Sequence, residues 1–310
     1  MNLLAPKLKI GDKIGIVAPS NPLNIESKRK LNKFKGYLED CGFKIKLSKN
    51  IFKTDQFNSS AGSPEKRAND INTMFKDPKI KAIWCFQGGE TANQTLDLLD
   101  FNLIGKNPKI FLGKSDIDVL SLAIHKITGL VTFHGCDAKI GDGREMDFDY
   151  TKKWFIERII NCAKAIEPKS RWITIREGLA EGKLLGCNQT SILKLVGTKY
   201  FPDFKESILF LETYKTKVKH LLFQIEQMNQ IGVFQKIKAM VVGNNYRFEG
   251  EKNNLFVKDI IKELTSKYQF PILKINEFGH YQPHAFLPIG ARVLVDATNK
   301  KIEILDNFLN

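Results

Sequence analysis

Short apolar runs alternate with helical patterns along the first half of the chain, and this alternation limits the folds that the chain can adopt. The apolar runs have the length of buried strands and cover residues 12–18, 43–47, 81–86 and 109–113, with a further run from Leu130. Between them, apolar residues recur at helical spacing, as at Leu31, Phe34, Leu38 and Cys41. A repeat of strand and helix predicts a parallel sheet whose active loops lie at the carboxyl edge of its strands.

The length of the chain predicts two domains, because 310 residues exceed what one hydrophobic core usually holds. Residues 1–137 carry the strand–helix repeat, and residues 138–170 form a charged connector that is predicted to be mostly helical. Residues 171–310 mix strands with helices. Strands are predicted at 208–211, 239–243 and 291–295, helices at 218–228 and 255–264, and a hairpin over 292–305.

Composition excludes several classes of protein. The five cysteines form no Cys-x-x-Cys and no Cys/His cluster, so we expect reduced core cysteines and neither a zinc site nor a disulfide framework. The chain has no signal-peptide pattern and no run near the roughly 20 apolar residues that span a bilayer. We therefore expect a cytoplasmic protein without a membrane partner. The net charge of +14 comes from lysines spread over many helices, which favours a solvated surface over nucleic-acid binding and would still attract an anionic substrate.

Ser115 occupies the most suggestive position for chemistry. It lies between the strand pattern at 109–113 and a helical pattern at 116–125. A turn of this kind exposes a side chain and points helix N–H groups at a forming anion, as acyl transfer requires. The same serine, with Asp118 three residues later, also fits a helix N-cap. Ile117 replaces the second glycine of the Gly-x-Ser-x-Gly elbow, so the residues alone leave both interpretations open.

A second turn contains two adjacent glycines, Gly88 and Gly89, after the strand pattern at 81–86 and before a helical stretch at 94–99. Adjacent glycines let the backbone approach a ligand closely and turn its N–H groups outward. A plain strand-to-helix turn and a nucleotide-binding loop are the alternatives. Neither nucleotide motif, Gly-x-Gly-x-x-Gly or Gly-x-x-x-x-Gly-Lys-Ser/Thr, occurs.

A carboxylate and an imidazole follow later in the chain, Glu212 after an apolar strand and His280 in a loop. With Ser115 they supply the inventory of a serine-hydrolase triad. Glu212 also fits a solvated strand end or a helix cap, and His284 competes with His280 for the role of base. His134, at a strand end, fits a hydrogen-bonded structural histidine.

The ordered set of short motifs resembles the LD-carboxypeptidases and their microcin-immunity relatives over nearly the whole chain. The motifs that carry this resemblance are Gly88-Gly89 with Asn93, residues 111–117, 132–135, 181–188, 210–212, 278–280 and 287–292. The resemblance implies a doubly wound parallel-sheet N-terminal domain and a β-rich mixed α/β C-terminal domain, with the site in the cleft between them. It implies Ser115 as nucleophile, His280 as general base and Glu212 as the carboxylate that orients the imidazole. The backbone N–H groups of Gly89 or Glu90 and of Asp116 would then form the oxyanion hole.

The function implied by this resemblance is a serine carboxypeptidase that cleaves an LD-amide bond of a murein tetrapeptide through an acyl-enzyme, without a metal or organic cofactor, as a homodimer. Hydrolysis of peptidyl- or aminoacyl-nucleotide amides, as in the immunity branch, and a non-catalytic ligand-binding protein are the alternatives. The chain departs from the family at Lys114, where a tyrosine is usual, at Glu90-Thr91, and at Cys187, which replaces a glycine. These departures affect the expected choice of substrate.

A carboxypeptidase must bind a terminal carboxylate, and burying that charge without cations or N–H donors is costly. The sequence analysis therefore assigns substrate binding to the Gly88 turn and to two cations, Lys114 beside the nucleophile and Arg247 after the predicted strand 239–243.

Overall fold

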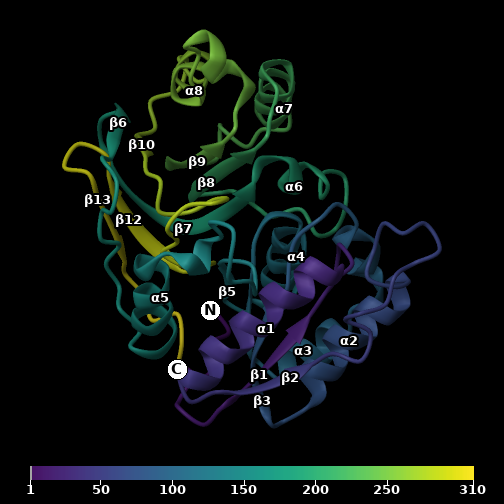
Figure 1. The fold of residues 1–310 in the computed structure, drawn as a ribbon. Helices are drawn as coiled ribbons and strands as arrows, with labels where there is room; N and C mark the ends of the chain where they lie inside the picture. Colours follow the sequence, from purple (N-terminus) through teal and green to yellow (C-terminus); the bar gives the residue numbers. More distant parts are fainter. Residues whose placement is uncertain (1) are drawn as a thin grey trace.

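The computed structural model describes residues 2–310 and contains two sheets, shown in Figure 1. The first sheet has six strands in the order β11-β5-β4-β3-β1-β2. Its strands are β1 (Lys13–Val17), β2 (Lys44–Leu47), β3 (Ile80–Cys85), β4 (Ile110–Gly113), β5 (Thr132–His134) and β11 (Leu287–Ile289). All neighbouring pairs from β2 to β5 are parallel, and β11 joins the β5 edge antiparallel. The predicted parallel sheet is therefore confirmed.

The helices around this sheet follow the sequence signals. They are α1 (Ile25–Asp40), α2 (Pro64–Lys76), α3 (Phe101–Lys106) and α4 (Asp118–Thr128). The apolar stripe of α1 is buried from Leu31 to Leu38. The side chain of Ser63 caps α2 by accepting from the N–H of Lys66, with Pro64 in the first turn.

The stretch predicted as a helix at 94–99 is a 3₁₀ turn, η1 (Ala92–Leu98). The hydroxyl of Thr95 donates to the Ala92 carbonyl at 2.8 Å, and such local side-chain bonds compete with regular α-helical bonding. The N–H of Leu99 bonds the Leu96 carbonyl three residues back, so the tighter turn continues to the end of the segment.

The second sheet has seven strands in the order β13-β12-β7-β8-β9-β10-β6. Its strands are β6 (Ile173–Arg176), β7 (Leu179–Asn188), β8 (Ser207–Tyr214), β9 (Ala239–Tyr246), β10 (Ile272–Lys274), β12 (Arg292–Asp296) and β13 (Lys301–Ile304). β7 to β10 are parallel, whereas β6, β12 and β13 pair antiparallel, so the mixed C-terminal sheet is confirmed. The antiparallel β12–β13 pair is the predicted hairpin.

Three helices accompany this sheet: α6 (Gln189–Leu193), α7 (Val218–Gln230) and α8 (Val257–Leu264). In Figure 1, α6 lies beside α4 at the junction of the two halves, and α7 and α8 lie at the far end of the second sheet. In the part of the chain that the structure describes, no helix is long and apolar enough to cross a membrane.

The connector is less helical than predicted. It contains the short turn η3 (Glu145–Asp147), helix α5 (Asp149–Phe155) and a wider π-type turn, η4 (Ile156–Ile160), and much of the rest is irregular. Gly141 and Gly143 adopt φ angles of 120° and 70°, which no α-helix contains. These left-handed glycines lie between Lys139 and Arg144, both of which line the cavity described below.

Strand β11 was not predicted, and it brings the C-terminal half into the N-terminal sheet. It has three residues, and Pro288 pairs with Phe133 of β5 at the edge of the sheet, where a missing N–H is tolerated. Trp84 of β3 joins the same parts of the chain: its ring lies 4.7 Å from Phe34, 5.1 Å from Phe155 and 5.9 Å from Phe286. The two halves therefore share one packed core.

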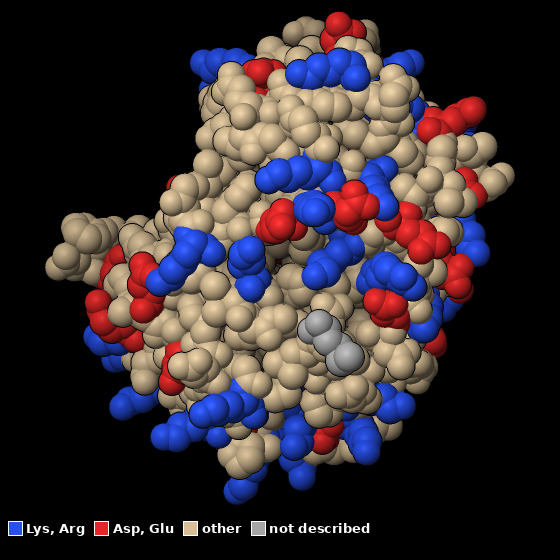
Figure 2. Space-filling view, turned by 180° about the vertical axis from the view of Figure 1, so that it is seen from behind, with Lys and Arg blue, Asp and Glu red and all other residues tan. Residues whose placement is uncertain are grey.

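Figure 2 shows Lys and Arg side chains spread over one face of the molecule and interspersed with Asp and Glu. This distribution agrees with the interpretation of the net charge as solvated surface on that face.

Candidate active site

Ser115 lies at the carboxyl end of β4, in the short turn η2 (Ser115–Ile117) that leads into α4. Its φ angle is 62°, a left-handed conformation that costs energy in a residue with a side chain and is common at functional sites. The turn needs Gly113 before it, because a Cβ there would lie 2.6 Å from Ile117 Cγ2. No side-chain cap bond is made at the start of η2 or α4, so the structure does not adopt the N-cap alternative for Ser115.

The two glycines pack directly against this turn. A Cβ on Gly88 would lie 2.9 Å from Ser115 Cβ and 3.2 Å from the Asp116 backbone nitrogen. A Cβ on Gly89 would lie 2.2 Å from Asn21 Oδ1. Within residues 2–310, the N–H groups of Gly89, Glu90 and Asp116 donate no hydrogen bond to another protein group. They are therefore available to a ligand oxygen beside Ser115.

The side chain of Asp116 holds this loop in place. It accepts from the Ser20 hydroxyl at 2.6 Å and from the Ala92 N–H at 2.8 Å. Its other oxygen accepts from Lys194 Nζ at 2.6 Å, and the same ammonium donates to the Glu90 carbonyl at 3.0 Å. Lys194 follows α6 in the C-terminal half, so a residue of one half fixes the glycine loop of the other.

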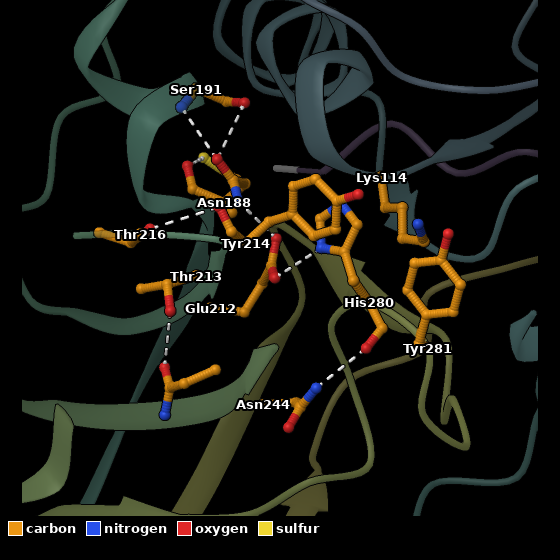
Figure 3. A network of polar contacts seen from close by, with 12 residues as sticks. Lys114, Asn188, Ser191, Glu212, Thr213, Tyr214, Thr216, Asn244, His280 and Tyr281 are labelled. Carbon is orange, nitrogen blue, oxygen red and sulfur yellow. Dashed lines mark hydrogen bonds and ion pairs between the residues drawn. The ribbon is translucent and has the colours of Figure 1, made fainter. Parts of the chain in front are cut away.

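His280 and Glu212 form a buried pair, shown in Figure 3. His280 Nδ1 lies 2.8 Å from Glu212 Oε2, and Asn188 Nδ2 donates to the other carboxylate oxygen at 2.8 Å. Burial alone would raise the pKa of Glu212, but the neighbouring imidazole of His280 holds that pKa below its usual range. Glu212 therefore remains an anion that can orient the imidazole. The ring of Tyr214 stacks on His280 at 4.3 Å.

Asn188 ends the 181–188 motif, and the sequence alone predicts no role for it. Its position at the end of β7 places it beside Glu212 of β8 in parallel register. In the sequence, the only sign of this contact is that Asn188 and Glu212 each follow an apolar run. That the two runs form neighbouring strands is visible only in the fold.

The competing histidines are buried elsewhere. His284 Nδ1 accepts from the Phe286 N–H at 3.2 Å, and burial holds the pKa of His284 well below its usual range. His134 Nδ1 lies 2.8 Å from Asp118 Oδ1, as in the structural alternative, and the two histidine rings are 5.1 Å apart. Neither lines the cavity that contains Ser115 and His280.

That cavity has a volume of about 450 Å³ and lies between the two halves. Its lining includes Ser115, His280, the glycine loop Gly88–Thr91, Asn21, Ser59, Gln87, Lys114, Asp137, Lys139, Arg144 and Tyr214. Asp137, Lys139, Arg144 and Tyr214 are among the lining residues that the sequence does not assign to the site. Lys139 and Arg144 come from the connector, to whose charges the sequence gives no function.

The two predicted cations differ in their surroundings. Lys114 lines the cavity but is 1% exposed and lies 3.5 Å from Asp137 and 3.3 Å from Glu145. Burial would lower the pKa of Lys114, but these carboxylates hold it above its usual range. Arg247 is exposed, lies outside the lining, and places its guanidinium 5.2 Å from the Tyr246 ring.

Two family models match the chain, the LD-carboxypeptidase N-terminal domain over residues 14–135 and the LD-carboxypeptidase C-terminal domain over residues 181–295. The chain belongs to the LD-carboxypeptidase family. The first model begins in β1 and ends after β5, and the second begins in β7 and ends in β12. In this member of the family, Ser115 therefore lies in one family domain, and Glu212 and His280 lie in the other.

Three relatives illustrate the similarity. YocD of Bacillus subtilis, which carries a provisional carboxypeptidase name, is 31% identical over 95% of this chain and 96% of its own length. The microcin C7 self-immunity protein MccF of Escherichia coli is 28% identical over 99% and 97% of the two chains, and the wild-type apo MccF structure superposes with a TM-score of 0.89. The muramoyltetrapeptide carboxypeptidase of Oxalobacter formigenes superposes with a TM-score of 0.80 at 25% identity, covering 95% of this chain and 99% of its own. The chain is thus a peptidase of a family that also includes immunity proteins.

Proposed function

We propose that the chain is a serine-type LD-carboxypeptidase that removes the terminal D-residue of a murein tetrapeptide. The observation that carries this proposal is the shared cavity: Ser115, in a strained turn, and His280, bonded to Glu212, line the same space beside a loop with free N–H groups. The relative from Oxalobacter formigenes carries the corresponding name.

The proposed reaction has two steps, formation of an acyl-enzyme and its hydrolysis. Glu212 accepts a hydrogen bond from Nδ1–H of His280, which leaves Nε2 of the imidazole free to accept the proton of the Ser115 hydroxyl. The serine oxygen attacks the amide carbonyl, and N–H groups of Gly89 or Glu90 and of Asp116 stabilise the oxyanion. The imidazolium then protonates the leaving amine, and water attacks the acyl-enzyme with His280 again as base.

Cleavage of an aminoacyl-nucleotide amide is the second candidate. MccF structures contain aspartyl sulfamoyl adenosine and glutamyl sulfamoyl guanosine. In this chain, the rings of Tyr246 and Tyr281 stack at 4.4 Å, and Tyr281 lines a hollow beside the catalytic cavity. Because Tyr246 and the guanidinium of Arg144 both lie over the Tyr281 ring, a planar base in the hollow would meet the edge of this stack.

Turnover of the two substrate classes distinguishes these functions. We expect hydrolysis of a murein tetrapeptide by the full chain, with no hydrolysis by Ser115→Ala, and slower hydrolysis of an aminoacyl sulfamoyl nucleoside. Preference for the nucleoside would assign the immunity-type activity. Turnover that persists in Ser115→Ala would refute the serine-type mechanism, and absent turnover of both substrates would favour a binding protein. A cytoplasmic location remains a prediction from the sequence, and a homodimer remains a prediction from the family resemblance.

A further inference from the structure

The charges around the catalytic cavity are unequal. Three cations, Lys114, Lys139 and Arg144, face two buried carboxylates, Asp137 and Glu145. Lys114 approaches both carboxylates within 3.5 Å. Glu90, which also lines the cavity, is exposed to water. Three positive charges and two buried negative charges leave one positive charge without a buried carboxylate partner. Because Lys114 contacts both carboxylates, this excess charge is shared by Lys139 and Arg144.

Arg144 has unused hydrogen-bonding capacity. Its only side-chain hydrogen bond to the described residues runs from Nη1 to Asp137 Oδ2, at 3.4 Å. Its Nε is buried without any partner, which is costly for a charged group unless a ligand supplies one. The guanidinium lies 4.5 Å from the ring of Tyr281. The backbone N–H of Tyr281 donates to Glu145 Oε1 at 2.7 Å, which fixes that residue. The guanidinium is therefore held against the Tyr281 ring, and its Nη2 donates no hydrogen bond to the described residues.

Lys139 has no ion-pair partner among residues 2–310. Its ammonium contacts the side-chain oxygen of Gln87 and lies 4.7 Å from the Phe86 ring. Burial lowers the pKa of Lys139 to about 8, so the ammonium would gain from a nearby anion.

Both cations stand where two spaces meet. Lys139 and Arg144 line the catalytic cavity and also an adjoining hollow of about 570 Å³. The other wall of the hollow includes Tyr281 and the carboxylates of Glu26 and Asp142, both of which are paired with Lys30. A peptide whose scissile bond reaches Ser115 would pass these two side chains if it extends from the cavity into the hollow.

We propose that Arg144 and Lys139 form a carboxylate subsite for the peptide substrate. An arginine edge binds a carboxylate with two parallel hydrogen bonds, and a lysine beside it adds a point charge. Lys114, predicted from the sequence for this role, instead forms ion pairs with Asp137 and Glu145. This inference rests on the proposed peptidase function. The carboxylate belongs either to the leaving D-residue or to a residue of the remaining peptide, and the substrates below distinguish these sources.

The test compares kcat/KM for three forms of a murein tetrapeptide: the free acid, the amide of its terminal carboxylate, and the amide of its internal carboxylates. The variants are Arg144→Gln and Lys139→Met, with Arg292→Gln and Lys267→Met as matched controls, since both control residues are exposed and neither lines the two spaces. We expect each subsite variant to lose roughly 10- to 100-fold on the free acid, as for a hydrogen bond to a charged group. When the recognised carboxylate is already amidated, each subsite variant is expected to lower kcat/KM by less than about threefold relative to the wild type, because the hydrogen bond is already lost. The amide that shows this small effect identifies which carboxylate the subsite binds.

Equal losses on all three forms, or losses no larger than those of the controls, would overturn the subsite. Arg144→Lys keeps the positive charge but lacks the planar guanidinium edge, so it should retain more of the preference for the acid than Arg144→Gln. This difference distinguishes a loss of carboxylate recognition from misfolding.

Binding keeps the test independent of turnover. With the full chain carrying Ser115→Ala, calorimetry should show tighter binding of the acid than of the amide, and adding Arg144→Gln should remove that difference. Equal binding of acid and amide would refute the subsite even if the peptide is hydrolysed. A preference for the acid without any hydrolysis by the wild type would keep the subsite and reject the proposed function. An equal dependence on Arg144 for an aminoacyl sulfamoyl nucleoside that has no carboxylate would also refute carboxylate recognition.

Discussion

At the scale of single residues, Ser115 is the position at which structure and chemistry can be separated. Because its side chain makes no cap bond, Ser115→Ala should lower kcat by about 10⁴- to 10⁶-fold, as for loss of a triad nucleophile, while the melting temperature changes little. Steady-state kinetics and thermal unfolding of the same preparation measure both quantities. Near-normal turnover together with a lower melting temperature would instead identify Ser115 as a structural residue.

The pH dependence of the reaction identifies the base. The rate should rise through one ionisation, since the imidazole of His280 must be neutral to accept the serine proton. Glu212, whose pKa is lowered beside His280, stays ionised over this range, and His284, whose pKa is lowered by burial, is already neutral. The rise of kcat/KM with pH should therefore persist in His284→Asn. The activity that remains in His280→Ala should show no such rise. Loss of this rise in His284→Asn alone would move the base to that residue.

At the scale of elements, the glycine loop is expected to be intolerant of any side chain. The Cβ of Gly88→Ala would lie 2.9 Å from Ser115 Cβ and 3.2 Å from a backbone nitrogen, so the loop or the serine must shift. A displacement near 1 Å in a catalytic arrangement costs up to about 100-fold in rate, and we expect a loss of this size in kcat. Gly36→Ala is the matched control, because that helical glycine has open space around its Cβ position and should gain about 0.5 to 1 kcal/mol of stability. Unchanged kcat in Gly88→Ala would show that the loop does not position the reacting groups.

The same scale shows what local sequence encodes. Apolar periodicity and caps predicted α1, α2, β3 and β4, because those signals act within a few residues. Strand β11 has three residues including Pro288 and carries no local signal, so only its pairing with β5 defines it. Isoleucines at helical spacing predict a helical connector, whereas the left-handed Gly141 and Gly143 interrupt it before η3.

Site residues follow the same division. Ser115, Glu212 and His280 were identified from family motifs at strand ends and loops. Arg144 and Lys139 lacked such motifs, and their position depends on packing between segments more than 50 residues apart, as in the contact of Lys139 with Gln87.

At the scale of the whole molecule, Lys194 links the halves at the site itself. Its ammonium bonds Asp116 at 2.6 Å and the Glu90 carbonyl at 3.0 Å, across the junction. Lys194→Gln should lower kcat by roughly 10-fold, because it removes a hydrogen bond to a charged group, and a smaller change is expected in KM. Lys199→Gln serves as control, since among the described residues this exposed lysine forms its only ion pair with the exposed Asp97. Equal kinetics of the two variants would mean that the loop keeps its position without the link.

The two halves should be inactive apart, because Ser115 and the Gly88–Gly89 loop belong to the first and Glu212 and His280 to the second. A fragment of residues 1–137 would also expose the β5 edge that β11 covers and remove Phe155 and Phe286 from the ring of Trp84. We therefore expect a fragment with a lower melting temperature than the full chain and no detectable hydrolysis of a tetrapeptide. The control is the full chain at the same concentration. Turnover by the fragment that Ser115→Ala abolishes would place the base within residues 1–137, with His134 as the candidate, and would contradict the assignment of His280.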